Sequence, residues 1–326
     1  MKNLRKQLRG WGYLLTHQNG ELIFKVASLE KAAKIPCGKE MEIVLSGSGV
    51  IDIKNVYPSL LSGLKIFFKS GRKIGCKLAA LNLEEIKLLV NQCKESLYNP
   101  IILTKCFVKA AIHNKKWLLK TLYEQETAMH RDKLTEVLNK VEQEKYVENV
   151  RAREAEAARI YFEALRSVLD KSYGFTGRTR QPPRDPVNAA LSFGYVWLYG
   201  IVAEELWMQG LDLRVSFLHV PWRKRTGLAL DLAEEFKQPI IDIVVLTMFK
   251  SKIFDMEEDF TRDRGVLLSR KGRSKLLKAL YTRLNFQFKL KGETRDLRSW
   301  ITTQVSKLKD HFLNNVLYEP FMVGDA

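Results

Sequence analysis

Cysteine is scarce in this sequence, and the few cysteines are widely separated. Among 326 residues there are four, and no two of them form a CxxC pair: Cys37, Cys76, Cys93 and Cys106. This spacing argues against a zinc ribbon and against a thioredoxin-type redox motif. We therefore expect reduced, mostly buried thiols, as in a cytoplasmic protein without a disulfide framework.

The signatures of several common enzyme classes are also missing. The sequence has no GxSxG elbow, no GxxxxGK[ST] phosphate loop, no GxGxxG after a predicted strand and no HExxH. These absences weigh against serine hydrolases, P-loop enzymes, dinucleotide-binding enzymes and zinc peptidases. No apolar run reaches the roughly 18–20 residues that span a bilayer, and the basic N-terminus lacks a long apolar core. We therefore expect neither a membrane span nor a signal peptide.

Positive charge, by contrast, is abundant. Lysine and arginine number 54 against 37 aspartate and glutamate residues, which gives a formal net charge of +17. Such an excess favours a polyanionic partner, and nucleic acid is the commonest one. A basic protein of the ribosome or of a membrane surface would show the same balance. Apolar residues make up 46% of the chain, which is enough for a substantial core.

The first eighty or so residues have the pattern of a β domain. Asn19-Gly20 separates two short apolar runs, which is a strong hairpin signal. Strands are predicted at 13–16, 21–26, 33–36, 41–45, 65–68 and 74–78. We therefore predict a small N-terminal β-sheet or β-sandwich domain over residues 1–81.

After Leu81 the apolar residues recur at helical spacing. Helices are predicted at 83–97, 99–123, 127–146, 148–170, 186–208, 228–237, 239–252, 270–284 and 296–313. One clear loop, rich in glycine, proline and arginine, spans 171–185. We predict a larger all-α C-terminal domain over residues 82–326, so the chain is a multidomain α and β protein.

Glu154 occupies an unusual place for a charged side chain. On a helix it falls on one stripe with Ala158, Tyr161 and Leu165, because residues three and four apart share a face. The ordinary interpretation is a boundary residue whose carboxylate reaches solvent. The alternative is a carboxylate that belongs to a site.

A histidine and several acids stand close together farther along the chain. His219 ends an apolar run, where a lone histidine is most often a hydrogen-bonded core residue. Asp231 shares a helix face with Glu234 and also with Glu235, so spacing does not choose between the two glutamates. Two acids and one imidazole form a reasonable ligand set for Mg²⁺ or Mn²⁺.

Two basic segments are candidates for contacts with phosphate. They are Arg178, Arg180 and Arg184 in the glycine- and proline-rich loop, and Arg223, Lys224 and Arg225 after the histidine. Guanidinium groups can bind phosphate oxygens through two hydrogen bonds, and a loop can follow a nucleic-acid backbone. The ordinary interpretation is a pair of solvated loops, and the net charge makes the phosphate interpretation about equally strong.

Several sequence blocks, in a fixed order, resemble those of one protein family. EAEAARIYF at 154–162, RTRQPPRDPVNAALSFGYVWLY at 178–199, FLH at 217–219 and LALDLAEEFKQPIID at 228–242 are similar to its main blocks. GRKIG at 71–75, RGVLLSRKGRSKLL at 264–277 and YEPFMV at 318–323 are similar to further blocks. The family is the CRISPR adaptation integrase, the first of the numbered Cas families, which inserts new spacers.

The resemblance implies a fold and a set of site residues. It implies an N-terminal β domain that dimerises and a helical domain that binds one divalent ion, Mg²⁺ or Mn²⁺. The implied residues are the ligands Glu154, His219 and Glu234, the supporting catalytic acid Asp231, and the supporting residues Tyr161 and Asn188. Ala155 replaces the glycine that usually follows the first ligand, and the basic segment 1–9 has no counterpart in the family pattern.

The resemblance also implies a reaction and its partners. A metal-dependent endonuclease and integrase of this kind joins the 3′-hydroxyl of a captured double-stranded DNA fragment to a phosphodiester at the boundary of a CRISPR repeat. The implied partners are DNA, a second copy of the chain and a small ferredoxin-like adaptation protein that bridges two dimers. The implied place is the cytoplasm of a prokaryote, away from the membrane.

Two other functions compete with this interpretation. A basic scaffold that holds DNA or RNA without chemistry would explain the net charge and the arginine-rich loop. It gives no reason for the spacing of Glu154, His219 and Glu234. A related transposon-borne integrase would share the fold and the site but would serve a mobile element.

Overall fold

The computed structural model describes residues 5–29, 32–36, 41–70, 73–80, 82–220, 226–290 and 292–324. The chain divides into two compact units, Met1–Ile86 and Lys87–Ala326. Several residues singled out in the sequence lie outside the described ranges: Cys37, Gly71, Arg72, Arg223, Lys224 and Arg225.

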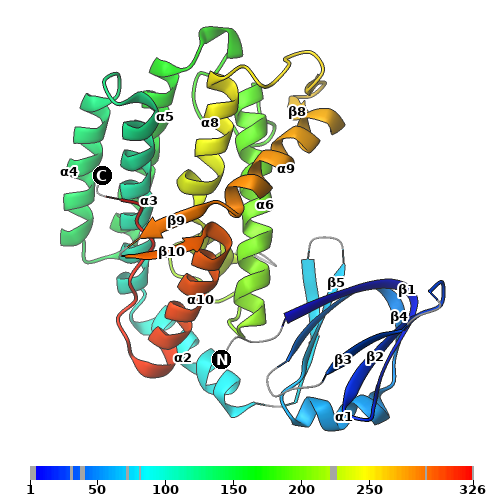
Figure 1. Ribbon diagram of the computed structural model, residues 1–326. Helices are drawn as coiled ribbons and strands as arrows, with labels where there is room; N and C mark the ends of the chain where they lie inside the picture. Colours follow the sequence, from blue (N-terminus) through cyan, green and yellow to red (C-terminus); the bar gives the residue numbers. More distant parts are fainter. Residues whose placement is uncertain are drawn as a thin grey trace. The chain divides into compact units, whose positions relative to one another are not determined.

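The N-terminal unit is built on one six-stranded mixed sheet with the order β3-β2-β1-β4-β5-β6 (Figure 1). Its elements are β1 (Arg5–Gln18), β2 (Glu21–Val26), β3 (Ala33–Pro36), β4 (Glu42–Ile51), α1 (Ile53–Leu61), β5 (Lys65–Ser70) and β6 (Lys73–Leu78). Asn19 and Gly20 both have positive φ, 50° and 79°, which is the backbone that a tight hairpin between β1 and β2 requires. β4 runs parallel to β1 and to β5. The core of this unit includes Leu15, Leu22, Ile43, Val56 and Ile66.

The predicted β domain is confirmed as one open sheet rather than a sandwich, and two details differ. α1 is absent from our prediction because it is short and contains Pro58; it begins where Asp52 accepts a hydrogen bond from the backbone N–H of Asn55. It forms the crossover that the parallel pair β4–β5 needs. Part of the basic segment 1–9 is not an extension, because β1 begins at Arg5 and pairs there with Glu42 of β4.

The C-terminal unit is largely helical, and most predicted helices are present with ends close to those predicted. The helix predicted at 228–237 ends at Ala233, and the one predicted at 239–252 begins within a π-helical segment. Its helices are α2 (Leu83–Tyr98), α3 (Ile101–Tyr123), α4 (Ala128–Gln143), α5 (Val147–Val168), α6 (Pro186–Met208), α7 (Gly227–Ala233), the π-helical segment η2 (Lys237–Asp242), α8 (Ile243–Lys250), α9 (Arg270–Leu284) and α10 (Leu297–Asn314). A single 3₁₀ turn, η1 (Lys171–Tyr173), opens the arginine-rich loop.

Two small hairpins interrupt this unit, so the all-α prediction is wrong in detail. They are β7 (Phe260–Arg262) with β8 (Val266–Leu268), and β9 (Gln287–Leu290) with β10 (Glu293–Asp296). Strands of three or four residues are too short to show the alternation that identifies a strand in a sequence.

α6 lies in the middle of the C-terminal unit and packs against α7, η2, α8, α9 and α10 (Figure 1). By length and composition it could cross a membrane, contrary to our expectation that no run is long enough. However, 61% of its most apolar window is buried against other parts of the unit, as in the core helix of a folded domain.

The cysteines within the described residues are less buried than expected. Cys76 is exposed, while Cys93 and Cys106 are partly buried, and all three are free thiols. The expectation that the cysteines are mostly buried is therefore wrong for these three, and their reduced state stays a prediction.

Candidate metal and DNA site

His219 lies on a tight turn whose backbone is organised by one buried carboxylate. Asp231 of α7 accepts hydrogen bonds from the backbone N–H groups of Phe217 at 2.7 Å, Leu218 at 3.1 Å and His219 at 2.9 Å. Its Oδ1 is also 2.7 Å from Nδ1 of the His219 ring. Asp231 is fully buried, so its carboxylate is satisfied by this turn and fixes the ring with Nε2 pointing away from it.

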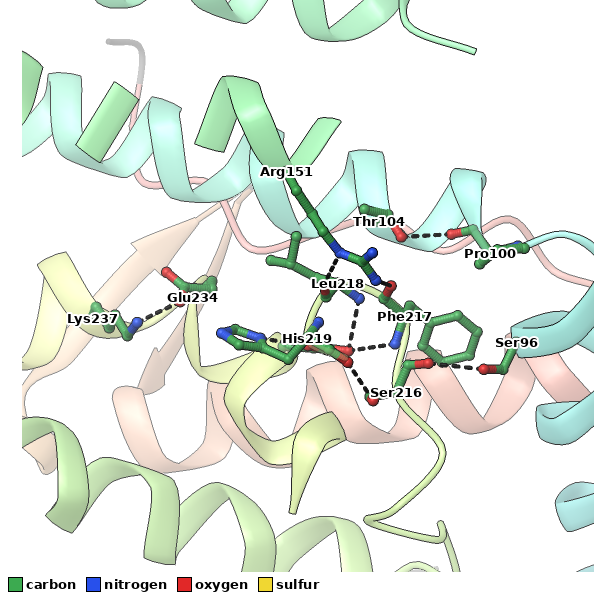
Figure 2. A network of polar contacts seen from close by, with 11 residues as sticks. Ser96, Pro100, Thr104, Arg151, Ser216, Phe217, Leu218, His219, Glu234 and Lys237 are labelled. Carbon is green, nitrogen blue, oxygen red and sulfur yellow. Dashed lines mark hydrogen bonds and ion pairs between the residues drawn. The ribbon is translucent and has the colours of Figure 1, made fainter. Parts of the chain in front are cut away.

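Two other elements hold the same turn (Figure 2). Arg151 of α5 donates from Nε to the Leu218 carbonyl at 2.6 Å and from Nη2 to the Phe217 carbonyl at 3.3 Å. Ser96 of α2 donates to the Ser216 carbonyl at 2.8 Å. The turn is therefore hydrogen-bonded to α7, α5 and α2, and these bonds to its backbone fix the position of His219 in addition to the bond made by its ring.

Glu234 follows α7 directly and is almost completely buried, with 4% of its surface exposed. Its Oε1 forms an ion pair with the ammonium of Lys237, one helical turn on (Figure 2). Burial alone would raise the pKa of Glu234, but the charges of Lys237 and Lys115 outweigh it and hold the pKa at about 2. Glu234 is therefore a carboxylate that stays ionised in a buried place.

The negative charge of Glu234 affects the pKa of His219. Burial lowers the pKa of His219, but the bond to Asp231 and the negative charge of Glu234 outweigh it, so the pKa is raised. Figure 2 shows the His219 ring extending from the turn toward Glu234 and Lys237. The structure thus brings together three of the predicted residues, His219, Asp231 and Glu234.

Glu154 lies on α5, three residues after Arg151, and is partly buried. Residues three apart share a helix face, so Glu154 is on the face that Arg151 joins to the 217–219 turn. Tyr161, two turns beyond Glu154, donates from its hydroxyl to Asp242 at 2.7 Å. Glu154 therefore stands between two fixed points on its helix, one at the His219 turn and one at the end of η2.

The side chains of His219, Glu154 and Glu234 are of the types that bind a divalent metal, although within the described residues they are not close enough together to surround an ion. Across those ranges, no three His, Cys, Asp or Glu side chains are grouped closely enough to hold an ion. The ammonium of Lys237 occupies one oxygen of Glu234. The His219–Asp231 pair nevertheless has the arrangement of metal-binding histidines, in which a carboxylate holds the other ring nitrogen.

Arg178 and Asn188 hold the arginine-rich loop rather than reaching outward. Arg178 donates to Asn188 Oδ1 at 2.8 Å and to Ser192 Oγ at 2.9 Å, and its guanidinium lies 5.4 Å from the centre of the Tyr195 ring. Asp185 caps α6 by accepting from the backbone N–H of Asn188 at 2.8 Å. Asn188 and Arg178 therefore both hold the loop in place, and the supporting role of Asn188 at the metal site stays a prediction.

Arg180 and Arg184, by contrast, are exposed on the same loop. They stay candidates for phosphate contacts, and Arg223, Lys224 and Arg225 lie outside the part of the chain that the structure describes.

Sequence reasoning missed the two lysines beside Glu234. Lys237 stands at i+3 from Glu234, a helical spacing that could have pointed to it. Lys115 is 4% exposed on α3, and nothing in its local sequence distinguishes it from the lysines around it. Asp242 and Tyr195 were missed as well, because a hydrogen bond between α6 and η2 has no local signature.

Comparisons with known sequences match most of the chain. A family model described as CRISPR associated protein Cas1 matches residues 8–282. CRISPR-associated endonuclease Cas1 1 of Thermus thermophilus is 40% identical over 190 residues, which are 58% of this chain and 60% of that relative. CRISPR-associated endonuclease Cas1 of Clostridium perfringens is 31% identical over 248 residues, 72% of each chain. The match to the first relative thus spans less than two thirds of its length.

Solved structures show the same fold. A casposase bound to its integration product has a TM-score of 0.80 at 18% identity and covers 98% of both chains. A CAS1 protein from Thermotoga maritima has a TM-score of 0.75 at 22% identity, with 96% of this chain and 97% of that one covered. A chain of a partial Cas6-RT-Cas1–Cas2 complex has a TM-score of 0.72 at 20% identity over 98% and 99%. They confirm the predicted fold class, a mixed β-sheet followed by a large helical region.

Proposed function

The chain belongs to the Cas1 family, and from that premise we propose that it is a metal-dependent DNA endonuclease and integrase of CRISPR spacer acquisition. The observation that carries the proposal is the His219 ring, held by Asp231 at 2.7 Å beside the ionised Glu234. A scaffold that only binds nucleic acid has no use for a buried, oriented imidazole next to a buried carboxylate.

We assign the chemistry to the chain's own residues as follows. His219 offers Nε2 as a ligand atom, and Glu234 and Glu154 offer carboxylate oxygens, which together suit Mg²⁺ or Mn²⁺. When bound, such an ion supplies positive charge for the phosphate that is attacked. Asp231 holds the imidazole in one tautomer, with the proton on Nδ1. Phosphoryl transfer needs positioning and charge neutralisation more than covalent help, so these roles are sufficient.

The proposed substrates are double-stranded DNA molecules, a captured fragment and a CRISPR repeat. The net charge of +17 supports a polyanionic substrate, and the exposed Arg180 and Arg184 are the proposed phosphate contacts that the structure describes. The casposase of similar fold was solved with its integration product, which supports strand transfer by this fold. Arg223, Lys224 and Arg225 remain proposed contacts from the sequence.

The proposed partners are a second copy of the chain and a small ferredoxin-like adaptation protein, in a prokaryotic cytoplasm. A chain of similar fold is part of a complex with Cas2, which supports a protein partner of that kind. We propose that residues 1–81 provide the dimer contact and that residues 82–326 carry the catalytic site.

The decisive experiment measures integration of a labelled DNA fragment into a plasmid that carries a repeat, with Mg²⁺ or Mn²⁺. Glu154→Ala and His219→Ala should abolish strand transfer while the variants remain folded. Equal integration by parent and variants would refute the site. Tight DNA binding without strand transfer, with every metal and partner tried, would instead favour the scaffold.

The target preference separates the CRISPR integrase from a transposon-borne one. Insertion at the repeat boundary supports the first, and insertion that ignores the repeat supports the second. The relatives at 31% and 40% identity are CRISPR-associated endonucleases, whereas the casposase is only 18% identical, so we propose the first.

The proposed DNA contacts have a separate test. Replacing Arg180 and Arg184 together by alanine should weaken DNA binding at all sequences alike and lower the salt dependence of the affinity by about one unit of slope per lost contact. Titrations of labelled duplex at several salt concentrations measure this slope. An unchanged slope would remove both arginines from the interface.

A further inference from the structure

Asp242 is a buried carboxylate that joins three separate elements of the C-terminal unit. It ends the π-helical segment η2 and is fully buried. The Tyr161 hydroxyl of α5 donates to its Oδ2 at 2.7 Å, and the Tyr195 hydroxyl of α6 donates to its Oδ1 at 2.7 Å. The Gln238 amide, within η2, donates to Oδ2 at 3.2 Å. Each carboxylate oxygen is thus fixed by a tyrosine from a different helix.

The rest of η2 is held equally closely. Gly194 of α6 lies so near Ile241 that an added Cβ would be 2.4 Å from its Cγ2, so only glycine allows this contact. Arg283 of α9 donates from Nε to the Pro239 carbonyl at 2.8 Å. A π-helical turn is rare in proteins and is found frequently at functional sites. This segment is therefore fixed to α5, α6 and α9 by specific contacts.

The two ends of this arrangement meet the proposed ligands. Lys237, the first residue of η2, pairs with Glu234 and lies 5.1 Å from the centre of the Tyr195 ring. Tyr161 lies on the same face of α5 as Glu154, about two turns away. Asp242 therefore connects to Glu154 through Tyr161, and to Glu234 through η2 and Lys237.

We propose that Asp242 is a positioning residue that sets the separation of Glu154 and Glu234 by fixing α5 and α6 to η2. The inference rests on the proposed function, because it concerns the metal site of that function. A ligand set on separate helices holds an ion only if those helices are kept in register, and Asp242 with its two tyrosines supplies a fixed point between them.

The test measures Mn²⁺ binding to the full chain by titration calorimetry, together with the Mn²⁺ concentration that gives half-maximal strand transfer. Tyr161→Phe and Tyr195→Phe each remove one hydroxyl from Asp242. Asp242→Asn replaces one acceptor oxygen by a donor, so it cannot accept from both hydroxyls. We expect each variant to bind Mn²⁺ roughly 10-fold more weakly, the size usual for residues that hold metal ligands in place.

The chain offers a matched control in Tyr318→Phe. The Tyr318 hydroxyl also donates to a buried carboxylate at 2.7 Å, that of Glu235, which is not a proposed ligand. This variant should lose a comparable bond and stability, yet bind Mn²⁺ as the parent does. A purely structural role of Asp242 would make all four variants alike in metal affinity.

The outcomes separate the inference from the function. If Tyr161→Phe and Tyr195→Phe bind Mn²⁺ as tightly as Tyr318→Phe and the parent, the inference is wrong, and these two variants decide even if Asp242→Asn does not fold. A parent that binds Mn²⁺ but transfers no strand contradicts the proposed function alone. A parent that does not bind Mn²⁺ contradicts both.

Discussion

Glu234 and Glu235 are neighbours in the chain, yet their carboxylates serve two different regions. Glu234 lies with His219, Lys237 and Lys115, and its pKa is held low, at about 2. Glu235 lies against the C-terminal segment, and burial raises its pKa to about 7 although several hydrogen bonds oppose this. The difference is one of partners, since Glu234 has ammonium groups beside it and Glu235 is bound mainly by neutral donors.

The carboxylate of Glu235 is held by residues near the end of the described chain, together with Gln304 of α10, whose amide donates to Oε2 at 3.2 Å. Its Oε1 accepts from the Tyr318 hydroxyl at 2.7 Å, and its Oε2 accepts from the backbone N–H of Phe321 at 2.8 Å. Asn114 donates to its carbonyl at 2.7 Å and to that of Phe321 at 3.0 Å. Two residues in sequence therefore divide between a charged site and a structural anchor, which helical spacing alone left open.

Strand transfer should show the largest difference between the two glutamates. Glu234→Ala should lower the integration rate by roughly 1000-fold or more, because it removes a proposed ligand of a metal that supplies several kcal/mol. Glu235→Gln should stay within a few-fold of the parent. Integration of the labelled fragment at saturating Mn²⁺ measures the rates of both variants. Equal losses would contradict the prediction that only Glu234 takes part in strand transfer.

The second-largest effect is expected on stability, when the lysine beside Glu234 is replaced. Lys237→Met leaves a buried carboxylate without its ion-pair partner and should lower the free energy of unfolding by roughly 3 kcal/mol. Lys307→Met is the control, since its pair with Glu319 lies at the surface and should contribute less than about 1 kcal/mol. Urea denaturation measures both values. Similar losses would mean that the buried pair of Glu234 and Lys237 contributes no more to the free energy of unfolding than the surface pair does.

The pH dependence of stability should distinguish Glu235. The unfolded carboxyl ionises near 4.5, whereas the folded one keeps its proton until about 7. The parent therefore loses stability as pH rises between these values, on the order of 2–3 kcal/mol, and Glu235→Gln does not. The free energy of unfolding of Glu235→Gln, relative to that of the parent, should therefore be higher at pH 8 than at pH 5. A constant difference would show that Glu235 is ionised in the fold like its neighbour.

Much of this arrangement could be predicted from the sequence, and the missing parts share a cause. Helix positions, the Asn19-Gly20 hairpin and the stripe that carries Glu154 follow from local periodicity and turn chemistry. The choice between Glu234 and Glu235 did not follow from spacing, because both lie on one short segment. It depends on Lys115 of α3 and on Tyr318, which are distant in sequence and meet α7 only in the folded unit.

The anchor at Glu235 has a consequence for how the protein is made. The backbone N–H groups of Phe321 and Val323 are bound by Glu235 and Asn114, so residues close to the end of the described chain complete the packing around Glu235. A ribosome synthesises these residues after His219 and Glu234, because they stand later in the chain. A growing chain that already contains the proposed ligands His219 and Glu234 therefore lacks these partners of Glu235 and Asn114 until Phe321 and Val323 have been made, so this part of the core forms only after that point.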